Sequence, residues 1–222
     1  MAISIEQQAE NILAKLVTDP GLKQFVDSDL HIPKPFRPDG EVKLIFLGQD
    51  PTVKNPKSRK WISTVLNLNK AGSLRNYLGE ICKGLGIELE KNVYATNYIK
   101  NFFIKPPTQI KEVDIFTKFA PIWLPFLQEE IAQFGNIPII TLGQPVLSLI
   151  IQGDTPKLVR EYWGYNNEWK TGKTLPFKRI ENNNNVLNRV IYPFPHQPSI
   201  SKQFYFSRLK EYIAFMQLSI AQ

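Results

Sequence analysis

The chain has 222 residues, 43% of them hydrophobic, which is enough to bury a substantial core within one domain. Its net charge of +7 favours a partner with a negative surface, and nucleic acid is the first candidate, with simple solubility as the plain alternative. A single cysteine, Cys82, excludes a disulfide framework, a cysteine zinc site and an iron–sulfur cluster. No apolar run approaches a membrane span. We therefore expect one cytoplasmic, monomeric domain over residues 1–222, without metal, cofactor or membrane partner.

The first half of the chain alternates helical and strand-like patterns. Residues 4–17 predict an amphipathic helix capped by Ser4, and the apolar run 42–47 predicts a strand buried on both faces. Apolar residues in 51–72 follow neither a helical nor a strand period. A helix then follows, for which Ser73 is the expected cap and Gly84 the expected C-terminal stop. A second strand, 93–96, leads into Asn97.

The second half continues the alternation. An apolar face over 115–134 predicts a helix that Pro121 and Pro125 should kink or divide. The remaining expected elements are a strand at 137–142, a helix at 145–152, an irregular insertion at 153–187, a strand at 190–194 and a final helix capped by Ser201. An antiparallel hairpin is one alternative within the insertion. Four strands separated by helical segments predict a three-layer α/β/α fold around a four-stranded parallel sheet.

Polar side chains follow each predicted strand. Gln49 and Asp50 follow the first strand, Asn97 the second, Gln144 the third and His196 the fourth. The carboxyl ends of parallel strands meet at one edge of the sheet, where ligands bind in open α/β folds. The sequence therefore predicts a site at this edge, although the turn taken alone favours Asp50 as a turn residue that caps the next segment.

Three runs without any acid strengthen this prediction. Residues 51–79, 91–111 and 182–210 contain only basic charges and follow three of the four strands. Each run alone is best explained as a solvated face, but together they place Asp50 as the lone carboxylate on a basic rim. Such a rim suits a phosphate backbone, and its positive charge would keep Asp50 ionised.

Phosphate-binding, dinucleotide-binding, serine-hydrolase and zinc-protease motifs are absent. Three segments instead resemble, in order and spacing, the uracil-DNA glycosylase superfamily. Residues 48–51, Gly-Gln-Asp-Pro, match its first motif; Asn97 ends the second strand, where the family has its base-recognising asparagine; and residues 196–201, His-Gln-Pro-Ser-Ile-Ser, resemble its C-terminal motif. The family fold is a four-stranded parallel sheet between helices.

The resemblance implies hydrolysis of the N-glycosidic bond of uracil, or a related deaminated base, flipped out of DNA. Asp50 would stabilise the cationic sugar and activate a water, and a neutral His196 would stabilise the departing base. The resemblance also implies that Gln49, Thr52 and Asn97 contact the base, on which an aromatic side chain stacks. Trp61 is the candidate for that aromatic, with Phe102 or Phe103 as alternatives. Ile200 would act as a wedge in the duplex, and Ser199, Ser201 and Lys202 would contact phosphates.

Two departures from the family pattern leave the preferred base open. Thr52 and Val53 stand where the uracil-specific branch has Tyr-His, whose tyrosine excludes thymine, and Gln197 stands where a proline commonly follows the histidine. One alternative is a member of the superfamily that binds nucleic acid without cleaving it. Another is a small-molecule hydrolase on the same fold, whose activity would depend only weakly on salt.

Overall fold

A computed structural model describes residues 4–220, so that the ends of the expected 1–222 domain, residues 1–3 and 221–222, lie outside the described part. Strands and helices alternate along the chain. The elements are α1 (Ile5–Leu16), β1 (Leu44–Gly48), α2 (Pro56–Arg59), α3 (Ser73–Gly84), α4 (Leu89–Asn92), β2 (Val93–Asn97), α5 (Ile115–Ala132), β3 (Ile139–Leu142), α6 (Gln144–Ile150), α7 (Val159–Tyr162), β4 (Ile191–Phe194) and α8 (Gln203–Ile220).

The four strands form one parallel sheet in the order β2-β1-β3-β4. Every residue of the four strands is buried, as the continuous apolar runs predict for a sheet covered on both faces. The register places Gly48 beside Asn97 at the carboxyl ends of β1 and β2. The same edge carries the ends of β3 and β4, so the convergence of the strand ends is confirmed.

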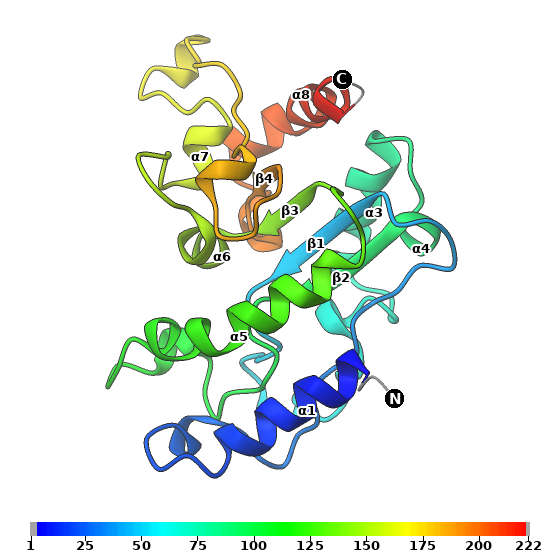
Figure 1. The fold of residues 1–222 in the computed structure, drawn as a ribbon. Helices are drawn as coiled ribbons and strands as arrows, with labels where there is room; N and C mark the ends of the chain where they lie inside the picture. Colours follow the sequence, from blue (N-terminus) through cyan, green and yellow to red (C-terminus); the bar gives the residue numbers. More distant parts are fainter. Residues whose placement is uncertain (1–3, 221–222) are drawn as a thin grey trace.

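Helices cover both faces of the sheet and complete the predicted three-layer α/β/α fold. Figure 1 shows α5 crossing in front of the sheet with α1 beside it, while α3 lies behind. The side chains of Tyr94 and Thr96 reach Glu130 of α5 on one face. On the other face α3 packs against α8, where Gly84 gives room to Ile213. Among the described residues, no helix is long and apolar enough to cross a membrane.

The predicted helix ends are correct at α1 and wrong at two other helices. Ser4 caps α1, since its hydroxyl oxygen accepts the Gln7 N–H at 3.1 Å. Helix α3 begins at Ser73 itself, after Gly72, and the left-handed residue beyond its end is Gly86 rather than Gly84. Helix α8 begins at Gln203, two residues after Ser201, whose hydroxyl donates to the Pro198 carbonyl at 3.1 Å.

The prolines of α5 do not divide it. Pro121 and Pro125 lie inside one continuous helix of 18 residues. A proline removes one backbone hydrogen bond and crowds the preceding turn. Burial of Phe119, Trp123 and Leu127 on the face toward the sheet offsets that loss, so packing overrides the local preference.

Residues 153–187 are irregular, as predicted, but they also contribute to the core. Trp163, directly after α7, is fully buried, stacks on Tyr212 of α8 at 4.4 Å between ring centroids, and donates its indole N–H to the Pro193 carbonyl at 2.7 Å. In place of the predicted hairpin, two isolated antiparallel bridges, Ile180–Ile191 and Ile151–Asn185, join the segment to β4 and to the residue after α6. The segment therefore anchors β4 to α8.

Candidate functional site

Asp50 lies on the turn that follows β1. Its Oδ1 accepts the Thr52 backbone N–H at 2.8 Å, and its Oδ2 accepts a hydrogen bond from Gln49 Nε2 at 2.7 Å. The first contact is the local turn that Asp favours, and the second fixes the other oxygen. Gln49 and Thr52, both predicted at the site, therefore contact the carboxyl group itself. The Thr52 hydroxyl in turn accepts the Phe103 N–H at 2.8 Å, which ties this turn to the segment after β2.

The environment of Asp50 differs electrostatically from the predicted one. Burial raises the pKa of its carboxyl to about 6, although the hydrogen bonds from Thr52 and Gln49 and the positive charge of Arg59 act to lower it. Desolvation therefore outweighs nearby charge at this position. The group is still mostly ionised at pH 7, but it titrates close to the physiological range, where a general base is effective.

His196 lies two residues beyond the end of β4 and shares a cavity with Asp50. Strand β3 lies between β1 and β4, and the residue after it, Gly143, has a left-handed φ of 95°. A methyl group on Gly143 would lie 3.2 Å from the His196 Cβ, so the glycine leaves room for the histidine. Partial burial of the imidazole lowers the pKa of His196, which favours its neutral form near pH 7. The sequence predicts the same form, but from positive charge rather than burial.

The cavity that Asp50 and His196 share, called the Asp50 cavity below, has a volume of about 380 Å³. Its walls come from the turn after β1, from residues 62–75 and from His196. Asp50 is the only acidic residue among the lining side chains, and Lys70 and Arg75 are the basic ones. One carboxylate, one imidazole and two cations therefore line the same cavity. Arg75 also pairs with Glu90, so part of its charge is neutralised.

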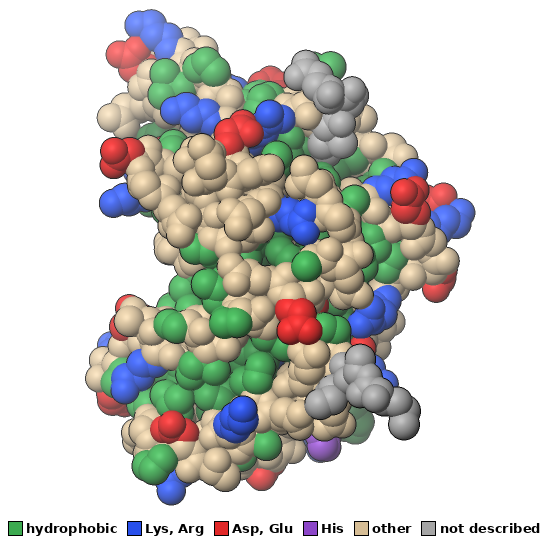
Figure 2. Space-filling model, viewed as in Figure 1, with side chains coloured by type: hydrophobic (Ala, Val, Ile, Leu, Met, Phe, Trp, Pro, Cys, Tyr) green, Lys and Arg blue, Asp and Glu red, His purple; other side chains and the backbone are tan. Residues whose placement is uncertain are grey.

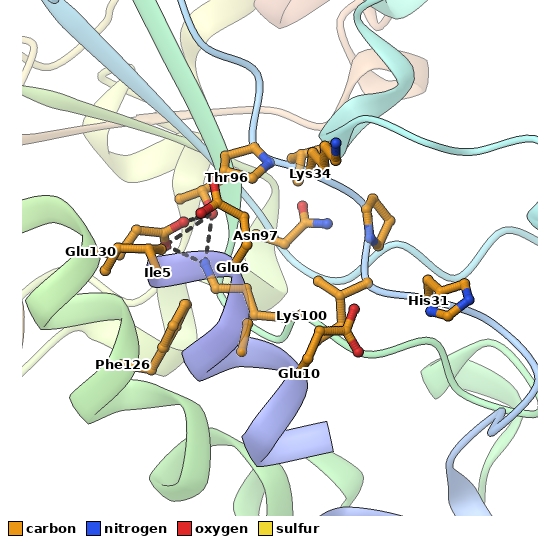
Figure 3. Close-up of a pocket in the computed structure, with 15 residues that line it drawn as sticks. Ile5, Glu6, Glu10, His31, Lys34, Thr96, Asn97, Lys100, Phe126 and Glu130 are labelled. Carbon is orange, nitrogen blue, oxygen red and sulfur yellow. Dashed lines mark hydrogen bonds and ion pairs between the residues drawn. The ribbon is translucent and has the colours of Figure 1, made fainter. Parts of the chain in front are cut away.

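Asn97 lies on a second cavity, called the Asn97 cavity below, with a volume of about 250 Å³. Figure 3 shows Asn97 at its centre, with Thr96 and Glu130 on one side and Lys34 and His31 on the other. Asn97 is 1% exposed, and its Oδ1 has no hydrogen-bond partner. The predicted trio is therefore divided, because Asp50 and His196 share one cavity while Asn97 lines the next.

A buried ion pair forms one wall of the Asn97 cavity, and sequence reasoning missed it. Lys100 and Glu130 are paired and only 4% and 2% exposed (Figure 3). Tyr94 and Thr96 donate further hydrogen bonds to Glu130. Burial lowers the pKa of Lys100, although Glu130 acts to raise it. One signal was present in the sequence: Glu130 falls on the apolar face of the predicted helix 115–134, where an unpaired acid would be costly.

The predicted stacking aromatic does not reach either cavity. Trp61 is 64% exposed, its ring lies 5.0 Å from Lys60 Nζ, and it is absent from the walls of both cavities. Phe102 and Phe103 are fully buried in the core. The apolar side chains that do line the Asp50 cavity include Ile62 and Leu66, which carry no distinguishing sequence signal.

The loop after His196 is compact. Residues Gln197–Ser199 form a 3-10 turn in which the Ser199 N–H donates to the His196 carbonyl at 2.7 Å. Ile200, the predicted wedge, is partly buried and packs against the core, whereas Ser201 and Lys202 are exposed. The loop therefore keeps His196 in place, and its exposed residues are Pro198, Ser201 and Lys202.

Two cations of the acid-free runs are not on the rim. Arg59 is 2% exposed and donates to the carbonyls of Val53, Phe103 and Ile104, and Lys100 is buried with Glu130. Figure 2 shows basic and acidic side chains interspersed on the face that it displays, without a continuous basic patch there. Two of the cations predicted for the basic surface are therefore buried, and the guanidinium of Arg59 pairs with backbone carbonyls that would otherwise lack a partner.

Within residues 4–220, no three His, Cys, Asp or Glu side chains lie close enough together to hold a metal ion. Neither the models of protein families nor the curated proteins give a match to this chain.

Proposed function

We propose that this protein is a DNA glycosylase that hydrolyses the N-glycosidic bond of uracil, or of a related deaminated base, in DNA. The observation that carries the proposal is the shared cavity of Asp50 and His196, two residues far apart in the sequence that follow β1 and β4. A carboxylate and a neutral imidazole on one cavity are the pair that this reaction needs. The motifs around both residues resemble those of the uracil-DNA glycosylase superfamily.

Each group has a role that follows from its chemistry. Breaking the bond leaves positive charge on the sugar and negative charge on the base. The Asp50 carboxylate, fixed by Gln49 and Thr52, stabilises the cationic sugar and orients a water for attack on it. A neutral His196 donates a hydrogen bond to the base and stabilises the departing anion. Asn97 offers an amide donor and acceptor to the base edge.

DNA is the proposed partner, and the substrate base must leave the duplex stack before it reaches the site. Ser199, Ser201 and Lys202 lie on the loop that follows His196, where hydroxyl and ammonium groups suit phosphate oxygens. Ile200 would act as the wedge only if it left its partly buried position. We propose a cytoplasmic repair enzyme that acts as a monomer without a cofactor.

The test is incubation of the purified protein with single- and double-stranded DNA containing uracil, hypoxanthine or xanthine, followed by alkali to reveal abasic sites. Asp50→Asn and His196→Ala should each lower cleavage by about 100-fold or more. Asp154→Asn, at an exposed position outside both cavities, is the matched control and should cleave as the wild type does. Absence of cleavage on all three bases would refute the proposal.

The runner-up is a protein that binds nucleic acid without cleaving it. It is favoured by the Asp50 contact to the Thr52 N–H, because a purely structural turn residue makes the same hydrogen bond. Under this alternative the wild type binds DNA but yields no abasic sites, and Asp50→Asn and His196→Ala leave the measured DNA affinity unchanged.

A further inference from the structure

A strained turn separates the Asp50 cavity from Asn97. Residues Val65–Asn67 form a 3-10 turn, called η2 below, in which Leu66 and Asn67 have positive φ angles of 55° and 52°. Asparagine tolerates this left-handed conformation, but leucine rarely adopts it. Both ends of the turn are fixed, since the Val65 N–H donates to the Lys34 carbonyl at 2.9 Å and Leu68 is fully buried. The strain is therefore confined to Leu66, between the anchored residues Val65 and Leu68.

The Leu66 side chain lies where Asn97 and the Asp50 turn come closest. A methyl group placed on Gly48 would clash with Asn97 Oδ1 and would lie 2.8 Å from Leu66 Cδ2. Leu66 and Asn97 thus converge above the Cα of Gly48, which is two residues before Asp50. Leu66 lines the Asp50 cavity and Asn97 does not, so the leucine stands between them.

Two buried amide oxygens flank this leucine without a hydrogen-bond partner. They are Asn97 Oδ1 and Asn67 Oδ1, and Asn67 belongs to the strained turn itself. Buried polar atoms in native proteins are nearly always paired, so an unpaired one calls for a specific reason. An N–H group of an incoming ligand would satisfy Asn97 Oδ1, but Leu66 occupies the approach from Asp50.

We propose that Leu66 is a gate and a specificity-determining residue for the base. With the gate closed, its side chain fills the space beside Asn97. When η2 turns Leu66 away, the base reaches Asn97 while its sugar stays at Asp50, and the strain in the turn is released. Leu66 borders the space that the base enters and does not contact the bond that breaks, so it governs access and size. This inference rests on the proposed function for its substrate, a base with an N–H beside a carbonyl.

The first experiment compares steady-state cleavage of uracil and thymine in the same DNA by the wild type, Leu66→Ala and Leu66→Gly. Both variants should lower KM for uracil with kcat little changed, and both should raise thymine cleavage relative to uracil. Glycine adopts left-handed φ without strain, so Leu66→Gly covers the case in which Leu66→Ala folds poorly. The matched control is Leu74→Ala, since Leu74 lines the same cavity but is not among the atoms nearest Gly48. Leu66→Met should restore wild-type discrimination.

The second experiment needs no turnover. Binding of free uracil is measured by calorimetry for the wild type, Leu66→Ala, Leu66→Gly, Asn97→Ala and the double variant Leu66→Ala/Asn97→Ala. An open state populated about one tenth of the time makes the leucine variants bind about tenfold more tightly, because they no longer have to open the gate. Asn97→Ala should abolish this gain.

The outcomes separate the gate from the reaction. If the wild type cleaves uracil but Leu66→Ala and Leu66→Gly leave both uracil affinity and discrimination unchanged, the gate is refuted and the glycosylase stands. If no substrate is cleaved but the gain in uracil affinity appears and depends on Asn97, the gate stands and the glycosylase fails. A gain of the same size in Leu74→Ala would also refute the gate, since any enlargement of the cavity would then suffice.

Discussion

Replacing Asp50 by asparagine should make the protein more stable while it removes activity. Burial raises the pKa of this carboxyl from an ordinary value of 3.8 to about 6, so the fold favours its neutral form. Above pH 6 the charged form destabilises the native state, and the difference between the two pKa values corresponds to about 3 kcal/mol. The substituted amide carries no charge. It still accepts the Thr52 N–H, and Gln49 can turn its own carbonyl toward the new N–H.

The expected gain depends on pH in a defined direction. Since the folded-state pKa lies above the unfolded one, the destabilisation by Asp50 is complete above about pH 6, declines as the pH falls and vanishes below about pH 4. Urea unfolding should therefore show Asp50→Asn about 3 kcal/mol more stable than the wild type at pH 8 and equal to it at pH 3.5. At pH 8 the melting temperature should rise by about 6–12 °C.

The control and the refutation use the same assay. Asp154→Asn, at an exposed position, should follow the wild type at both pH values. If Asp50→Asn were less stable than the wild type at pH 8, the two hydrogen bonds would outweigh desolvation, and Asp50 would be a structural turn residue. A gain without pH dependence would show that the carboxyl is not the titrating group.

Three further predictions follow from the electrostatics of the molecule. Cleavage by the wild type should rise with pH through about 6 as Asp50 ionises, and a profile without an inflection there would contradict its role as the carboxylate. Lys100→Met should lower the free energy of unfolding in urea by about 3–5 kcal/mol, because it leaves Glu130 buried without its partner. Adding Glu130→Gln should recover part of this loss. A loss under about 1 kcal/mol would contradict a charged Lys100–Glu130 pair in the fold. DNA affinity measured between 50 and 200 mM salt should fall steeply, and a flat response would point to the small-molecule hydrolase instead.

The fold was largely predictable because its main signals are local. Each strand is a short, fully buried apolar run, and the alternation with helices allows few other arrangements. The errors lie where local preference meets packing. Pro121 and Pro125 remain inside a helix whose buried face holds it together, and the Ser201 hydroxyl bonds back to the Pro198 carbonyl two residues before α8 begins.

The site was predictable only in part. The rule that parallel strands end at one edge brings Asp50 and His196 together on one cavity. It gives no strand order, and the observed order places Asn97 on the outer strand β2, next to a different cavity. Nothing in the sequence marks Leu66 as left-handed, since neither glycine nor asparagine stands there. Counting charges also cannot distinguish a surface cation from Arg59, which is held by backbone carbonyls.

The position of β4 has a consequence for how the molecule becomes complete. This strand is the last along the chain and pairs only with β3 within the sheet, and His196 lies two residues beyond its end. During synthesis the chain emerges from its N-terminus, so the turn that carries Asp50 is available long before its histidine. The Asp50 cavity with His196 in its wall exists only after the final strand has docked and α8 has packed behind it. A nascent or C-terminally truncated chain can therefore hold Asp50 in place and yet lack the assembled pair, which couples reactivity to completed folding.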